Sequence, residues 1–83
     1  MTDAQIERVL LRVAEAARRE PGSVNVEHTF EDIALDSLSA VSLAGDLEEE
    51  FDVTLPNEEI LRLRTVADAI ACLDRALAPR DDA

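Results

Sequence analysis

Aromatic residues and cysteine are scarce in this sequence, and each shortage narrows what the chain can be. Among 83 residues only Phe30 and Phe51 are aromatic, and tryptophan and tyrosine are absent. The hydrophobic content of 47% therefore comes chiefly from leucine, isoleucine, valine and alanine, which favours helices over strands. A chain of this length is expected to form one domain with a limited core. The lone cysteine, Cys72, excludes an intramolecular disulfide and a cysteine metal cluster.

Several kinds of functional residue are missing as well. Long apolar runs are absent, so we expect neither a signal peptide nor a membrane span, and we expect the protein in the cytoplasm. Nothing matches an EF-hand loop, so we expect no metal site. His28 is the only histidine and has no candidate nucleophile nearby, and Cys72 fits a small buried residue better than a reactive thiol. We therefore predict no catalytic residue.

Positive charge is the third shortage. Lysine is absent, and the sequence has eight arginines and nineteen acidic residues, which gives a net charge of −11. Such a chain repels nucleic acids and anionic membranes, so neither is an expected partner. No arginine lies within residues 20–60, a stretch with twelve acids: Glu20, Glu27, Glu31, Asp32, Asp36, Asp46, Glu48, Glu49, Glu50, Asp52, Glu58 and Glu59. A merely solvated face would intersperse both signs, so we expect a docking surface for basic patches of other proteins.

The first part of the chain is predicted to be a helix followed by a long loop. Apolar residues recur at helical spacing over residues 3–19, Thr2 and Gln5 fit a capping box, and Pro21-Gly22 is expected to end the helix. Residues 20–36 form a loop, which at this length is usually functional. Five apolar residues are expected to anchor it on the helices: Val24, Val26, Phe30, Ile33 and Leu35.

Three further helices are predicted. The second runs from Ser37 to Phe51 with Asp36 as its N-cap, and a short third helix over residues 57–61 follows Pro56. The fourth begins at Thr65, with Asp68 as capping partner, and ends at Pro79. We therefore expect an all-α four-helix bundle of three longer helices and one short helix. It fills a single domain over residues 1–79, and residues 80–83 form a frayed tail.

Asp36-Ser37-Leu38 lies where the long loop meets the second helix. A hydroxyl there stands beside the free N–H groups of the first helical turn, and these groups with the helix dipole favour a phosphate. A covalent phosphodiester on Ser37 would therefore be well placed. Asp and Ser are also common capping residues, and on these three residues alone capping is the better explanation.

The flanking sequence reverses that preference. Residues 30–38 read Phe-Glu-Asp-Ile-Ala-Leu-Asp-Ser-Leu and residues 47–51 read Leu-Glu-Glu-Glu-Phe, a pattern that resembles the acyl carrier protein family. Leu55-Pro56 followed by acids, and the start of the last helix at Thr65-Val66, also look like that family. The resemblance spans nearly the whole chain with matching order and spacing.

The resemblance implies a carrier and not an enzyme. Ser37, beside Asp36, would be the attachment residue for 4′-phosphopantetheine, which a phosphopantetheinyl transferase moves from coenzyme A. Acyl intermediates would be held as thioesters on the terminal thiol of this arm. The implied fold is a right-turning four-helix bundle of acyl-carrier type, whose core can open to shelter the acyl chain. We expect a monomer.

The resemblance also implies how partners bind. An acyl-loading enzyme, a ketosynthase or an acyltransferase, each with a basic docking patch, would dock on the second helix. Fatty acid synthesis and polyketide-type pathways both use such carriers. The predicted docking residues are Leu38, Asp46, Glu48, Glu49, Glu58 and Glu59.

The sequence departs from the family pattern at four positions. Ala34 stands where glycine is usual, Ser42 where many members carry an acid, and Gly45 and Asp46 where apolar residues are usual. We expect the turn to tolerate the Cβ of Ala34, and the missing side chain at Gly45 to widen the acyl pocket or change the fit to partners. With the absence of lysine, the departures at Ser42, Gly45 and Asp46 favour a specialised bacterial pathway, such as antibiotic biosynthesis.

Two alternatives stay open. One is an aminoacyl or peptidyl carrier, although those typically show His-Ser where this chain has Asp36-Ser37. The other, of a different class, is an acidic helical interaction module without a prosthetic group. The module predicts that Ser37→Ala leaves function intact, whereas the carrier predicts its complete loss with the fold preserved.

Overall fold

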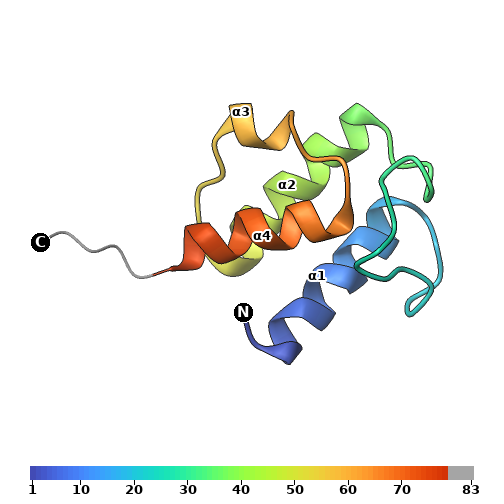
Figure 1. The fold of residues 1–83 in the computed structure, drawn as a ribbon, viewed down its shortest axis with the longest axis horizontal. Helices are drawn as coiled ribbons and strands as arrows, with labels where there is room; N and C mark the ends of the chain where they lie inside the picture. The colour runs from blue at the N-terminus through green and yellow to red at the C-terminus, as the bar shows by residue number, and fades with distance from the viewer. Residues whose placement is uncertain (79–83) are drawn as a thin grey trace, which may run out of the picture.

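The computed structural model describes residues 1–78, which form four helices and no strand. Figure 1 shows the helices α1 (Asp3–Ala16), α2 (Ser37–Phe51), α3 (Asn57–Ile60) and α4 (Val66–Leu77). The all-α prediction of three longer helices and one short helix is confirmed. Helix α4 ends at Leu77 with Ala78 as its C-cap, just before the predicted stop at Pro79. Pro79 itself and the predicted frayed tail over residues 80–83 lie outside the described residues. Within residues 1–78, no helix has the length and apolarity that a membrane crossing requires.

Helices α1, α2 and α4 enclose the core, and α3 crosses the end of the bundle beside α2 (Figure 1). Among the described residues, every fully buried side chain is apolar, so burial contributes almost purely through the hydrophobic effect. The core comprises Val9, Val13, Ala14, Val24, Phe30, Ile33, Leu35, Leu43, Ala44, Leu47, Leu55, Ile60, Val66, Ala69, Cys72 and Leu73.

The helix starts follow the sequence prediction. The capping box of Thr2 and Gln5 is present at α1, and that of Thr65 and Asp68 at α4. At α2, the carboxylate of Asp36 accepts a hydrogen bond from the Ser39 N–H at 2.8 Å. These caps depend on side chains within three residues of the N–H groups that they satisfy, which is why a local pattern predicts them.

The predicted end of the first helix is wrong by three residues. Helix α1 ends at Ala16, because Arg18 takes a left-handed conformation with φ 57°. The Arg18 N–H then bonds to the Glu15 carbonyl at 3.1 Å, and the Arg19 N–H bonds to the Ala14 carbonyl at 2.8 Å. This pair of bonds is the Schellman closure, in which glycine is the usual left-handed residue. Pro21-Gly22 therefore lies beyond the end of the helix.

The long loop is fastened to the start of α4. The Phe30 N–H bonds to the Arg64 carbonyl at 2.9 Å, and the Val66 N–H bonds to the His28 carbonyl at 3.0 Å. These bonds form an antiparallel bridge between Thr29 and Thr65. Four of the five predicted anchors are buried: Val24, Phe30, Ile33 and Leu35. The fifth was wrong, since Val26 is 41% exposed.

Ala34 occupies a backbone conformation that suits glycine, with φ 57°. Replacing Ala34 by glycine is expected to raise the free energy of unfolding by about 1 kcal/mol, because Cβ crowding in the left-handed region disappears. Thermal unfolding monitored by circular dichroism measures the change. The control is Ala71→Gly on the exposed face of α4, where the same substitution should lower stability by about 1 kcal/mol. A loss of stability at both positions would contradict the assignment of strain to Ala34.

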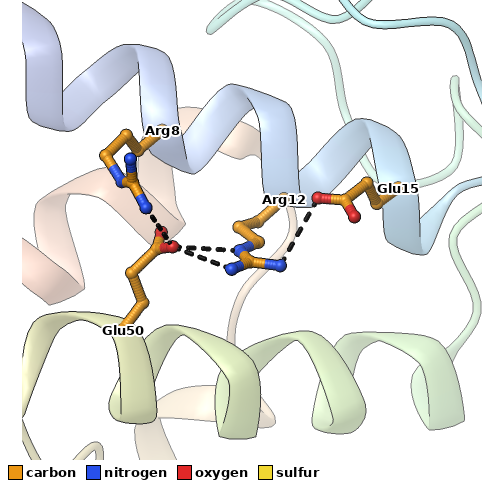
Figure 2. Close-up of polar contacts among 4 residues, drawn as sticks. All are labelled: Arg8, Arg12, Glu15 and Glu50. Atoms are coloured by element: carbon orange, nitrogen blue, oxygen red, sulfur yellow. Dashed lines mark hydrogen bonds and ion pairs between the residues drawn. The ribbon is translucent and has the colours of Figure 1, made fainter.

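Figure 2 shows the ion-pair cluster that joins α1 to α2. One carboxylate oxygen of Glu50 accepts from Arg8 Nη2 at 2.7 Å and from Arg12 Nη2 and Nε at 2.9 and 3.2 Å. The Glu50 side chain is only 11% exposed, and its other oxygen is buried without a partner among residues 1–78. The hydrogen bonds from Arg12, and then those from Arg8, lower the pKa of Glu50.

Replacing Glu50 by glutamine is expected to destabilise the fold by about 1 kcal/mol at neutral pH, because the acceptor of two guanidinium groups loses its negative charge. For a domain of this size the unfolding temperature should fall by about 4–8 °C. The pKa of Glu50 is lower in the folded than in the unfolded chain. Ionised Glu50 therefore stabilises the fold fully when the pH is above 4.5, the ordinary pKa of a glutamate. This stabilisation by Glu50 is lost as the pH falls through the pKa of Glu50 in the folded state. The difference from the wild type should therefore shrink in melts below that pH. Glu49→Gln, on the exposed neighbour, is the control, and equal effects of the two substitutions would contradict a role for the cluster.

Candidate functional site

Ser37 is the first residue of α2 and is exposed to solvent. The sequence left open whether this serine serves as a cap or as a site of chemistry. The structure assigns the cap to Asp36, whose bond from the Ser39 N–H lowers the pKa of its carboxyl and keeps it ionised. The hydroxyl of Ser37 makes no hydrogen bond within residues 1–78, so it is free to react.

The surroundings of Ser37 suit a covalently attached phosphate. The N–H groups of the first turn of a helix have no partner within the helix, and the helix dipole is positive at that end. The Asp36 carboxylate accepts from one of these donors, the Ser39 N–H at 2.8 Å, while the Ala40 N–H makes the first regular bond of the helix, to the Asp36 carbonyl at 2.9 Å. A phosphodiester on Ser37 would therefore lie at the favourable end of the fifteen-residue helix α2.

An open cleft of about 680 Å³ begins at Ser37 and runs between the long loop, α2 and the segment that links α3 to α4. Its walls mix apolar side chains with a few charged ones, a composition that can hold a long, partly polar arm. The cleft is lined by Thr29, Phe30, Glu31, Ala34, Leu35, Asp36, Ser37, Ala40, Val41, Ile60, Leu61, Leu63 and Arg64.

The interior of the bundle is closed. An internal cavity between α2 and α4 measures about 10 Å³, which is close to the limit for a single water molecule. Its walls are apolar and include Phe30, Leu43 and Cys72. Sheltering an acyl chain inside the core therefore requires the helices to separate. The predicted burial of Cys72 is confirmed, and this burial raises the pKa of its thiol.

The predicted docking residues fall into two groups. Leu38, Asp46, Glu49 and Glu58 are exposed, with Leu38 at 81%. Glu48 and Glu59 are half-buried and bonded within the protein: the Leu55 N–H donates to Glu48 at 2.8 Å, and Arg75 donates to Glu59 at 2.8 Å. Since Glu50 is also paired with arginines, the acidic surface is smaller than the count of acids indicates.

Gly45 does not face the acyl pocket. The residue is exposed, and a Cβ placed on it would meet nothing within 4 Å. The expectation that the missing side chain widens the pocket was therefore wrong, because this position lies on the solvent side of α2. An effect on the fit to partners stays a prediction.

The cleft also brings together residues that the sequence prediction missed. Val41 and Leu61 line it and are 50% and 73% exposed. Helical spacing could have indicated Val41, which lies three residues after Leu38 on one face of α2. No local signal separates Leu61 from its buried neighbour Ile60, because a four-residue helix is too short to show a periodic pattern.

His28 has a structural contact and no catalytic arrangement. Its Nδ1 accepts a hydrogen bond from the Asn25 N–H at 3.1 Å, which holds the turn before the bridge to α4. Within residues 1–78 no hydroxyl or thiol is hydrogen-bonded to this imidazole. His28 lies in the long loop as predicted, and the absence of a catalytic role stays a prediction.

Comparison with known proteins gives a consistent result. A family model described as the phosphopantetheine attachment site matches residues 7–73. Acyl carrier proteins of Kocuria rhizophila and Kineococcus radiotolerans are 39% and 36% identical to this chain, over 80 and 78 residues. The aligned parts cover 90% of this chain and 99% of the Kocuria protein, and 88% of this chain and 96% of the Kineococcus protein.

Solved structures share the fold. The acyl carrier protein of Thermotoga maritima aligns with a TM-score of 0.77 at 23% identity, covering 93% of this chain and 95% of that one. The malonyl acyl carrier protein of the actinorhodin polyketide synthase from Streptomyces coelicolor aligns with a TM-score of 0.71 at 27% identity, covering 100% and 95%. With a family model matched over most of its length, this chain belongs to the acyl carrier proteins, which carry a covalently attached 4′-phosphopantetheine group.

Proposed function

We propose that Ser37 is the attachment residue for 4′-phosphopantetheine, and that the chain presents acyl groups on this arm to partner enzymes. The main support for the proposal is the exposed Ser37 hydroxyl, which has no hydrogen bond within residues 1–78 because Asp36 caps α2. A serine that served only as a cap would have its oxygen bonded to the first helical turn.

The residues around Ser37 fit the group. The start of α2 favours the phosphodiester through its N–H groups and dipole, and the adjoining cleft offers room for the rest of the arm. When attached, the group supplies a terminal thiol on which acyl chains are held as thioesters. The protein's own part is to hold the arm at an exposed helix start, and its only cysteine is buried in the core.

The chain is proposed to act as a carrier without catalytic activity of its own. Cysteine and histidine are common catalytic nucleophiles and bases. In this chain Cys72 is buried in the core, and the ring of His28 is hydrogen-bonded within a turn. The partners would be a phosphopantetheinyl transferase and the acyl-loading enzyme, ketosynthase or acyltransferase of a fatty acid or polyketide type pathway, in the cytoplasm. Likeness to the actinorhodin carrier favours the polyketide type.

Docking on α2 is proposed to rest on its exposed residues. Leu38 follows the attachment serine, and Asp46 and Glu49 continue along the helix as exposed carboxylates. These acids attract a basic patch and speed its encounter. Glu58 adds a further exposed acid at the start of α3.

Mass spectrometry of the intact chain tests the proposal. The purified chain is incubated with coenzyme A and a promiscuous phosphopantetheinyl transferase. The expected result is a mass increase of one phosphopantetheine group, which fragmentation localises to Ser37. No increase, or an increase localised to another residue, would overturn the proposal.

A further inference from the structure

The arginines of residues 1–78 divide into paired and unpaired side chains. Arg8, Arg12 and Arg75 form ion pairs with acids of another helix. The side chains of the others form no ion pair or hydrogen bond within residues 1–78; these are Arg18, Arg19, Arg62 and Arg64. Of these four, only Arg64 lines the cleft that begins at Ser37. The wall of this cleft therefore holds one unpaired cation among the described residues.

The backbone of Arg64 is held from both sides. Its N–H donates to the Asp68 carboxylate at 3.1 Å, and its carbonyl accepts from the Phe30 N–H at 2.9 Å. These bonds join Arg64 to the start of α4 and to the long loop, while its side chain stays exposed. A backbone that is already fixed lowers the entropy lost when the side chain binds a ligand.

The acids that line the same cleft leave the guanidinium of Arg64 unpaired. Asp36 binds the Ser39 N–H at 2.8 Å, and Glu31 is exposed and forms no ion pair within residues 1–78. A guanidinium carries five N–H donors in a planar fork that suits phosphate and carboxylate oxygens. Arg64 is therefore open to an oxyanion that a ligand brings into the cleft.

We propose that Arg64 binds an oxyanion of the group attached to Ser37 and so holds that group in the cleft. This inference rests on the proposed function of Ser37. Two parts of the attached group can carry such an oxyanion: the phosphodiester of the arm, and a carboxylate at the end of an acyl group derived from a dicarboxylic acid. Both offer Arg64 a charge-assisted hydrogen bond, which is stronger than a bond to a neutral acceptor.

Apolar residues next to Arg64 add to this binding. Leu63 precedes Arg64, the N–H of Phe30 binds its carbonyl, and both of these residues line the cleft. The arm carries two methyl groups next to its phosphodiester, and contact of these methyl groups with apolar side chains is favourable. This wall of the cleft therefore offers a cation beside apolar surface, which matches an oxyanion beside methyl groups.

Side-chain NMR of the Arg64 Nε–H group tests the inference on the complete, isotopically labelled chain. Spectra are recorded before loading and after a promiscuous phosphopantetheinyl transferase has loaded the chain from coenzyme A, propionyl-coenzyme A or malonyl-coenzyme A. Binding of the phosphodiester moves the Arg64 signal in all three loaded chains, whereas binding of a cargo carboxylate moves it in the malonyl chain alone. Either result supports the inference. An Arg64 signal that stays in place in every loaded chain, or an Arg62 signal that moves equally, would overturn it.

Contacts of the docked arm give a second measurement, made on the loaded chain with the largest Arg64 shift. Nuclear Overhauser contacts between the arm's methyl groups and Leu63 should weaken about fivefold in Arg64→Gln, because one charge-assisted bond in an open cleft is lost. Arg64→Lys keeps the charge without the planar fork and should lie between the two. The matched control is Arg62→Gln, which changes the net charge equally at an exposed residue outside the cleft. Its contacts should stay within about twofold of those in the wild type.

Two further checks separate the possible failures. The backbone bonds of Arg64 do not involve its side chain, so circular dichroism should show that the variants are folded. Equal contacts in Arg64→Gln and Arg62→Gln would overturn the inference alone. A wild type whose intact mass shows no phosphopantetheine after incubation would overturn the proposed function, and this inference with it.

Discussion

Replacing Ser37 by alanine is expected to abolish attachment of phosphopantetheine completely, while the fold stays intact. The hydroxyl oxygen is the proposed nucleophile, and alanine has none. Stability should change by no more than about 0.5 kcal/mol, because the side chain is exposed and Asp36 supplies the cap. Intact mass after incubation with coenzyme A and the transferase measures the loss, and circular dichroism measures the fold.

The matched control is Ser42→Ala, because Ser42 is an exposed serine on the same helix. This variant should be modified at Ser37 as fully as the wild type. A mass increase that persists in Ser37→Ala would move the site to another hydroxyl. An unmodified Ser37→Ala chain that still supported the biological function would favour the interaction module without a prosthetic group. The experiment therefore separates the two classes that the sequence left open.

The largest expected effect on stability comes from Leu73→Ala in the centre of α4. Leu73 has 0% exposure and is among the largest fully buried side chains. Truncation removes buried apolar surface and leaves a cavity, so the free energy of unfolding should fall by about 3 kcal/mol. A domain of this size has a total of about 4–12 kcal/mol, so a large share of its stability would be lost.

Thermal unfolding should show this loss as a decrease of more than about 10 °C in the midpoint. Leu11→Ala is the control, because Leu11 is 43% exposed and its truncation should cost less than about 1 kcal/mol. If the two substitutions had equal effects, the assignment of Leu73 to the core would be wrong.

Local patterns predicted the beginnings of helices better than their ends. Thr2, Asp36 and Thr65 cap N–H groups within three residues of themselves, so the relevant interaction is visible in a short window of sequence. The end of α1 depends instead on the positive φ of Arg18, a conformation that an arginine in the sequence does not indicate. The prediction from helical spacing therefore made the first helix too long.

Burial within the long loop shows a similar limit. Val24 and Val26 are both valines in the same loop, yet only Val24 reaches the core. The loop is held by its bridge to Thr65, thirty-six positions along the chain from Thr29. No feature of the loop sequence alone specifies which valine points inward once that bridge forms.

The sequence by itself determined the helical class, the three side-chain caps and the place of Ser37 at the start of α2, since all of these depend on neighbours along the chain. Only the tertiary structure decided which charged and apolar groups are free for partners. Glu50 is paired with Arg8 and Arg12 of α1, and Glu59 with Arg75 of α4, whereas Leu61 stays exposed at the cleft. The physical reason is that ion pairs and burial join residues far apart in sequence, and their partners are settled only when the helices pack.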